Sequence, residues 1–60
     1  MTTEAKFIGL DAYAVPRVYG VGQTAEIAET ECWEAAKEYV VRRPDTGPLS
    51  EWTVDRAPRP

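Results

Sequence analysis

The chain opens with alternating apolar and polar positions, the pattern of a β-strand. Residues 5–15 form this strand, and the face that we expect to be better buried carries Ile8, Leu10, Ala12 and Ala14. The opposite face carries Phe7, Asp11 and Tyr13. Pro16-Arg17 then predicts a turn, and the apolar run of residues 18–22 predicts a second strand that forms a hairpin with the first.

The next segment has the repeat of an amphipathic helix. Thr24 is suited to the N-cap, and Glu26 lies in the first turn, where a carboxylate meets the positive end of the helix dipole. The helix is expected to end near Arg43, because Pro44 disfavours helical geometry in the residue before it. Its apolar face, with Trp33 at the rim, consists of Ala25, Ala28, Cys32, Ala35, Ala36 and Tyr39.

The last part of the chain predicts a turn, a strand and a tail. Residues 45–48 favour a turn, and residues 51–55 alternate as a third strand with Trp52 and Val54 facing inward. Residues 56–60 are expected to be a flexible tail. The predicted fold is α+β, a three-stranded sheet with one helix packed on one face in the order β-β-α-β, and residues 1–55 form a single domain. The pattern leaves open whether the third strand runs parallel or antiparallel to the first.

Composition excludes several kinds of chemistry. The 60 residues include no His and one Cys, so the chain lacks the residues of a Cys/His zinc site or a Cys-His nucleophile pair. We therefore expect neither an enzyme nor a metal or cofactor site. The single Cys32 favours a reducing compartment or a buried thiol, with intermolecular pairing as the lesser alternative, and we expect the cytoplasm of a bacterial host. No apolar run approaches the ~18 residues of a membrane span, so no membrane partner is expected.

Negative charge is concentrated on the predicted helix. The net charge is −3, and five of the ten acidic residues lie between Glu26 and Glu38, beside the single base Lys37. Helical spacing places Ile27, Glu31, Glu34, Glu38 and Val41 on one stripe, roughly opposite the apolar face. A solvated helix face is the simpler interpretation of such a charge run. The functional interpretation is a surface for a basic protein partner, to which Glu26 and Glu29 also contribute charge.

Aromatic side chains provide a second candidate surface. One helix covers one face of a sheet, so Phe7, Tyr13 and Tyr19 are expected to be exposed or half-exposed on the other. They either pack on one another and on neighbouring side chains or form a contact patch, since Tyr is favoured in interfaces. Direct nucleic-acid binding is not expected, because the acidic surface repels a phosphate backbone.

Residues 18–28, followed by Ala35-Ala36, resemble the strand-to-helix passage of HicB-like antitoxin domains, in which a glycine-containing strand end precedes a Thr or Ser cap and an Ala-rich helix. By element order the resemblance covers about residues 5–54. It implies a module that neutralises a small basic toxin. The sequence departs from that family in lacking an appended DNA-binding domain, so operator binding is not implied.

In its size, acidity and lack of histidine, the chain is also similar to the anti-CRISPR proteins of phages and mobile elements. That resemblance implies a stand-alone, non-enzymatic inhibitor whose acidic surface blocks nucleic-acid binding by a CRISPR effector complex. A helical row of carboxylates about 5–6 Å apart mimics the spacing of backbone phosphates. A monomer is favoured for this function, and a dimer is the expectation for an antitoxin.

Overall fold

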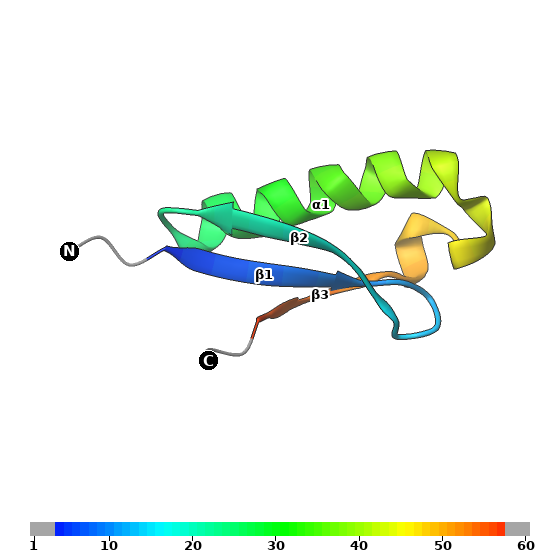
Figure 1. Cartoon of the computed structure of the whole chain (residues 1–60), viewed down its shortest axis with the longest axis horizontal. Coiled ribbons are helices and arrows are strands. Elements are labelled where there is room, and N and C mark those ends of the chain that lie inside the picture. Colours follow the sequence, from blue (N-terminus) through cyan, green and yellow to red (C-terminus); the bar gives the residue numbers. More distant parts are fainter. Residues whose placement is uncertain (1–3, 58–60) are drawn as a thin grey trace.

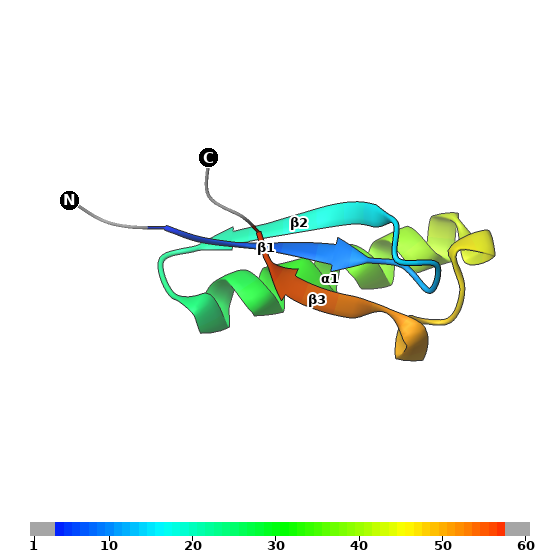
Figure 2. The same ribbon diagram turned by 90° about the horizontal axis from the view of Figure 1, so that it is seen from below.

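The computed structural model describes residues 4–57 and has an α+β fold with one sheet and one long helix (Figure 1). Its elements follow the predicted β-β-α-β order, with two short 3-10 helices before the last strand. They are β1 (Ala5–Leu10), β2 (Pro16–Gly22), α1 (Ala25–Arg42), η1 (Pro44–Thr46), η2 (Leu49–Glu51) and β3 (Thr53–Arg56). The helix lies across one face of the sheet, and Figure 2 shows the sheet from its uncovered side.

The sheet has the order β2-β1-β3, with β1 antiparallel to both neighbours. This arrangement settles the orientation that the sequence left open. Since β2 and β3 are each antiparallel to β1, they are parallel to each other, and α1 carries the chain across the sheet between them. Both β2 and β3 are edge strands, and each leaves one row of backbone groups facing outward.

The ends of α1 follow the expected capping chemistry. The Ile27 N–H donates to the Thr24 hydroxyl at 3.2 Å, which satisfies one of the free amides of the first turn. At the other end, the Arg43 N–H donates to the Tyr39 carbonyl at 2.7 Å, and Pro44 begins η1. The N-cap and the end of the helix near Arg43 are therefore confirmed.

The core lies between α1 and the sheet. Its central cluster of buried residues consists of Val18 from β2, Cys32 and Ala36 from α1, and Trp52 before β3. The Tyr39 and Trp52 rings pack edge to face with their centroids 5.9 Å apart. Partly buried residues surround this centre, including Trp33 at the rim and Val54, both as predicted.

Close approach of the helix depends on small residues in the sheet. A Cβ atom on Gly20 would lie 2.3 Å from both the Ala28 carbonyl oxygen and the Cys32 nitrogen. Gly22 is similarly tight, because a Cβ there would lie 2.5 Å from Cγ2 of Ile27. Gly20 and Gly22 are therefore the part of β2 on which α1 rests.

The predicted faces of β1 are wrong. Phe7 and Gly9 face α1, because Phe7 packs against the core and a Cβ on Gly9 would touch Val18 and Cys32. Ile8 and Leu10 therefore lie on the uncovered side of the sheet. Both sets of alternating positions contain apolar residues, so the period alone did not distinguish them. The small residue Gly9, opposite Val18 in the register, marks the face that accepts the helix.

The predicted ends of the strands also need correction. β1 stops at Leu10, and the loop of residues 11–15 makes the turn that Pro16-Arg17 was expected to make. Pro16 instead begins β2, where an edge strand tolerates its missing N–H. At the other end, Arg56 belongs to β3 and the Ala57 N–H donates to the Lys6 carbonyl at 2.9 Å, so these two residues are not part of a tail. The rest of that predicted tail, residues 58–60, lies outside the described residues.

Candidate protein-binding surfaces

The acidic stripe (Ile27, Glu31, Glu34, Glu38 and Val41) lies on the solvent side of α1. All five residues are exposed, with Ile27 at 49% and Val41 at 82% of their full accessibility. The helix runs without interruption through this segment, so the spacing that placed these residues on one side holds. Two exposed aliphatic side chains therefore flank three carboxylates along one line.

The carboxylates of the stripe are free to meet an external cation. Among residues 4–57, ion pairs join Asp11 to Arg17 and Asp45 to Arg43, and none involves Glu31, Glu34 or Glu38. Nearby like charges along a helix repel one another, so a basic partner would relieve that repulsion.

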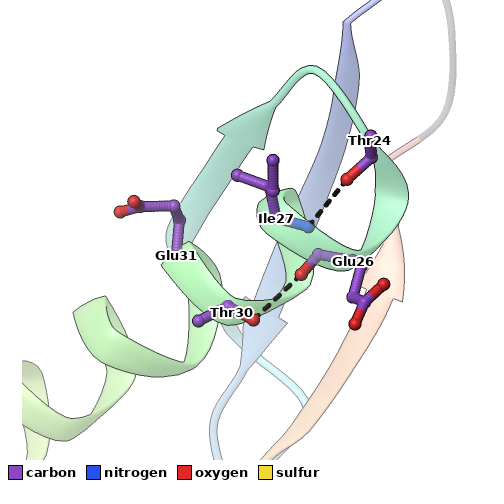
Figure 3. Close-up of a pocket in the computed structure, with 5 residues that line it drawn as sticks. All are labelled: Thr24, Glu26, Ile27, Thr30 and Glu31. Atoms are coloured by element: carbon purple, nitrogen blue, oxygen red, sulfur yellow. Dashed lines mark hydrogen bonds between the residues drawn. The ribbon is translucent and has the colours of Figure 1, made fainter.

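Glu26 and Glu29 do not belong to the stripe. Helical periodicity places them on the flank of α1 that carries Trp33, and Figure 3 shows Glu26 projecting away from Ile27 and Glu31. They contribute to the negative potential of the helix without extending the line of carboxylates.

A shallow pocket lies over the first turns of α1 (Figure 3). It has a volume of about 370 Å³ and is lined by Thr24, Glu26, Ile27, Thr30 and Glu31. The two hydroxyl groups are used within the helix, since the Thr24 hydroxyl accepts from the Ile27 N–H and the Thr30 hydroxyl donates to the Glu26 carbonyl. The aliphatic side chain of Ile27 and the carboxylates of Glu26 and Glu31 are therefore the groups left to contact a ligand.

The uncovered face of the sheet is a second exposed surface. The register pairs Ile8 with Tyr19 and Lys6 with Val21 across β1 and β2, which places these four side chains on the side away from α1. Tyr19 is 55% exposed and Val21 46% exposed. The Lys6 ammonium lies 4.9 Å from the centre of the Tyr19 ring, a cation–π contact. On β1 and β2 this face is mainly apolar, with the basic side chain of Lys6 at one end, and β3 adds the polar side chains of Thr53 and Asp55 opposite Leu10 and Ile8.

The three aromatic residues proposed as a second partner surface do not come together. Tyr19 lies on the uncovered face, and Tyr13 is 71% exposed in the loop between β1 and β2. Phe7 lies on the opposite side of the sheet, against the core, with the Arg56 guanidinium 5.8 Å from its ring centre. Phe7 is therefore removed from that surface, because β1 turns this side chain toward α1.

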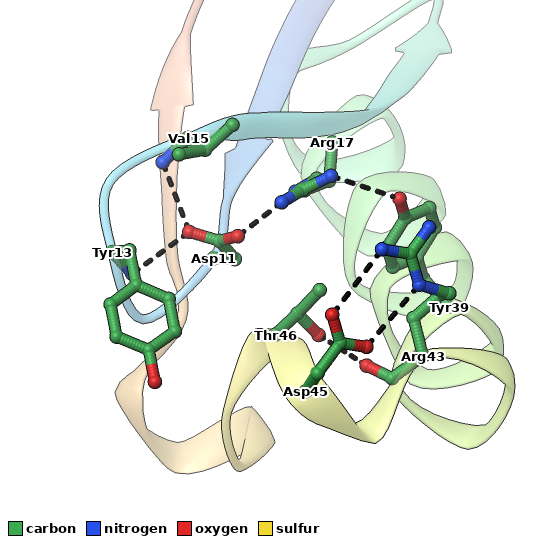
Figure 4. A network of polar contacts seen from close by, with 8 residues as sticks. All are labelled: Asp11, Tyr13, Val15, Arg17, Tyr39, Arg43, Asp45 and Thr46. Carbon is green, nitrogen blue, oxygen red and sulfur yellow. Dashed lines mark hydrogen bonds and ion pairs between the residues drawn. The ribbon is translucent and has the colours of Figure 1, made fainter.

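Sequence reasoning missed a buried carboxylate that organises the hairpin (Figure 4). Asp11 is 2% exposed, and one of its oxygens accepts from the N–H groups of Tyr13 at 2.8 Å and Val15 at 3.0 Å. Its other oxygen accepts from Arg17 Nε at 2.9 Å, and Arg17 continues to the Tyr39 hydroxyl at 3.4 Å. Burial alone would raise the pKa of Asp11, but the hydrogen bonds from Val15, Arg17 and Tyr13 together lower that pKa below its ordinary value. The network holds the loop of β1 and β2 to α1.

In the described residues, the single thiol and the carboxylates are not gathered into one site. Cys32 is fully buried, and burial, followed by the negative charge of Glu29, raises the pKa of its thiol. Within residues 4–57 no three Cys, Asp or Glu side chains converge as a metal-binding group. The exposed features of the described residues are the acidic stripe and the uncovered face of the sheet.

The fold and its exposed surfaces define a small α+β domain with an acidic helix on one side of the sheet and an apolar face on the other. No protein family, no curated protein and no solved structure matches the chain. In the described residues, no helix has both the length and the apolar character needed to cross a bilayer.

Proposed function

We propose that this chain is a non-enzymatic inhibitor that binds a basic surface of another protein through the acidic stripe. The observation that carries the proposal is the line of three exposed, unpaired carboxylates on α1 between Ile27 and Val41. Charge-assisted hydrogen bonds to Arg and Lys supply attraction and orientation, and the two aliphatic ends add apolar contact.

The partner that we propose is a CRISPR effector complex in a bacterial cytoplasm, as for the anti-CRISPR proteins that the chain resembles. The stripe would occupy the basic channel that binds nucleic acid, so inhibitor and nucleic acid would compete for the same Arg and Lys side chains. The geometry supports this kind of competition because carboxylates on successive helical turns repeat at a spacing close to that of phosphates. The inhibitor acts as a monomer in this proposal.

Competition for nucleic acid is the direct test. Purified effector complex would be titrated with the protein while its binding to labelled target DNA is measured, at low and at high salt. The triple variant Glu31→Gln, Glu34→Gln, Glu38→Gln is expected to lose the competition while remaining folded. The matched control, Glu4→Gln, Glu51→Gln, Asp55→Asn, removes the same net charge from exposed positions outside α1 and is expected to keep the competition.

The outcomes show whether competition depends on the arrangement of the carboxylates or only on the total charge of the protein. If the two triple variants lose competition equally, only net charge matters and the stripe has no special role. If the wild-type protein does not compete with nucleic acid, the proposed inhibition of the effector is wrong.

A HicB-like antitoxin is the second candidate. The observation that favours it is the uncovered apolar face beside the edge strand β2, since an antitoxin module is expected to use its sheet to cover a small toxin and to dimerise. Sedimentation of the purified protein distinguishes the two candidates, because a tight dimer favours the antitoxin and a monomer favours the inhibitor.

A further inference from the structure

The two edges of the sheet are protected to different extents. β3 is four residues long and carries Asp55 and Arg56, which are features that discourage another strand from pairing with it. β2 is seven residues long, and Arg17 is its one charged residue. The Arg17 guanidinium is bound to Asp11 and Tyr39, so its charge is not free to discourage another strand from pairing with β2. The stretch of residues 18–22 has neither a charge nor a proline.

The outer backbone groups of β2 are available. In the described part of the chain, the backbone hydrogen bonds made outside the strand pairs and α1 involve loops, caps and Ala57, and none involves residues 16–22. One side of β2 pairs with β1, and no element pairs with the other side, which forms the upper edge of the sheet in Figure 2. A strand added at this edge would complete hydrogen bonds that the chain itself does not make.

The two sides of the β2 edge differ in chemistry. On the helix side, Ile27 contacts Gly22 at the end of β2, and Figure 3 shows Ile27 and Glu31 projecting from α1 toward the side of β2. On the uncovered side, Tyr19 and Val21 present apolar surface. Because successive side chains of a strand point to opposite faces, an added strand would meet carboxylate and apolar surface alternately.

A second copy of this chain is a poor occupant of the edge. Antiparallel pairing of two β2 strands would place both helices on the same face of the joined sheet, with the two acidic stripes turned toward each other. Like charges so placed repel. A basic strand would instead bring opposite charge to the same position.

We infer that β2 binds an extended segment of the partner as a fourth strand, in which Lys or Arg residues alternate with apolar residues. The basic side chains lie on the helix side and reach Glu31 and its neighbours in the stripe. The pocket over Ile27 accepts the aliphatic stem of one of them, with its charged end beside Glu31. The apolar side chains extend the surface of Tyr19 and Val21. This inference rests on the proposed function, since it specifies the structure of the basic partner segment.

Two synthetic peptides of identical composition test the inference. In the first, Lys and Val alternate, and in the second the same residues are grouped into a Lys block followed by a Val block. The alternating peptide is expected to bind roughly tenfold more tightly and to slow hydrogen exchange of outward-facing amides in residues 17–22, as followed by NMR. Glu31→Lys is expected to weaken the alternating peptide about tenfold, whereas Glu51→Lys, outside the stripe, leaves it unchanged.

The other possible outcomes of the peptide experiment bear on different parts of the inference. Equal binding of both peptides without protection of β2 amides overturns strand addition but leaves the acidic stripe as a binding surface. Absence of binding by either peptide, while the protein still competes with nucleic acid, overturns strand addition alone. Binding and protection by the alternating peptide without competition at the effector would support the strand site and reject the proposed partner. A peptide-free dimer with protected β2 amides would overturn the choice of occupant.

Discussion

Arg17 Nε donates a 2.9 Å hydrogen bond to the carboxylate of Asp11, and the same guanidinium lies against Tyr39 of α1, 5.9 Å from its ring centre. The pair joins the end of β1, the start of β2 and the last turns of the helix. Asp11 also accepts from two backbone N–H groups of the loop, in which Ala14 has a positive φ of 62°. A buried charge of this kind is retained because both of its oxygens have donors, three in all, and one of the donors is itself charged.

Asp11→Asn is expected to remove part of the acid sensitivity of the fold. The pKa of Asp11 in the folded protein lies below its ordinary value of 3.8, so its contribution to stability is complete above that pH and is lost as the pH falls through the lower, folded value. The asparagine oxygen still accepts from Tyr13 and Val15, but its amide group faces Arg17 without an acceptor. Thermal unfolding followed by tryptophan fluorescence between about pH 2 and 6 measures the effect.

The variant should melt several degrees below wild type at neutral pH and show a shallower loss of stability in acid. Asp55→Asn, on an exposed position of β3, is the matched control and should keep the wild-type slope. Asp45 also contributes to the acid slope, because its hydrogen bonds from Arg43 lower its pKa. Equal slopes in wild type and Asp11→Asn would show that the network does not govern acid stability.

Gly20→Ala is expected to destabilise the domain by about 2–3 kcal/mol, because the added methyl group meets helix backbone rather than a movable side chain. A small domain has little stability to lose. Urea unfolding measures the change, with Ala57→Gly as a control that alters the same two residue types at the end of the sheet. A Gly20→Ala variant as stable as wild type would mean that α1 shifts away from β2 without cost.

These residues show how far the sequence predicted the fold. Thr24, Pro44 and the spacing of Ala28, Cys32 and Ala36 determined the helix correctly, because capping and helical periodicity depend on nearby residues. The faces of β1 were not determined, because both carry apolar side chains and only packing against α1 selects Phe7. The Asp11 network depends on contacts between β1, β2 and α1, which no local pattern reveals. The position of the acidic stripe on one exposed side of α1 was predicted, since it follows from helical spacing alone, and its role in binding stays a prediction.

Cys32 is expected to react with thiol reagents only when the domain opens. Its side chain is fully buried and burial raises the pKa of the thiol, so both access and thiolate formation are reduced. Labelling with an aromatic disulfide at mild alkaline pH should be roughly a thousandfold slower than in urea. A Cys32→Ala, Val41→Cys variant places the thiol on an 82% exposed position and should react at the rate of a free thiol. Fast reaction of wild-type Cys32 would show that α1 separates readily from the sheet.

Substitutions of Ile27 and Val41, at the two ends of the acidic stripe, are expected to change stability by different amounts but to weaken partner binding alike. Val41 is almost free of contacts with the rest of the domain, so Val41→Ser should change the free energy of unfolding by less than about 0.5 kcal/mol. Ile27 is half-buried against Gly22, and Ile27→Ser should cost about 1 kcal/mol. Both variants should bind the basic partner more weakly, because each removes an apolar contact at one end of the line of carboxylates. Calorimetric titration with the partner, beside urea unfolding, separates the two effects. Unchanged affinity in the folded Val41→Ser variant would confine the interface to the carboxylates and the β2 side of the helix.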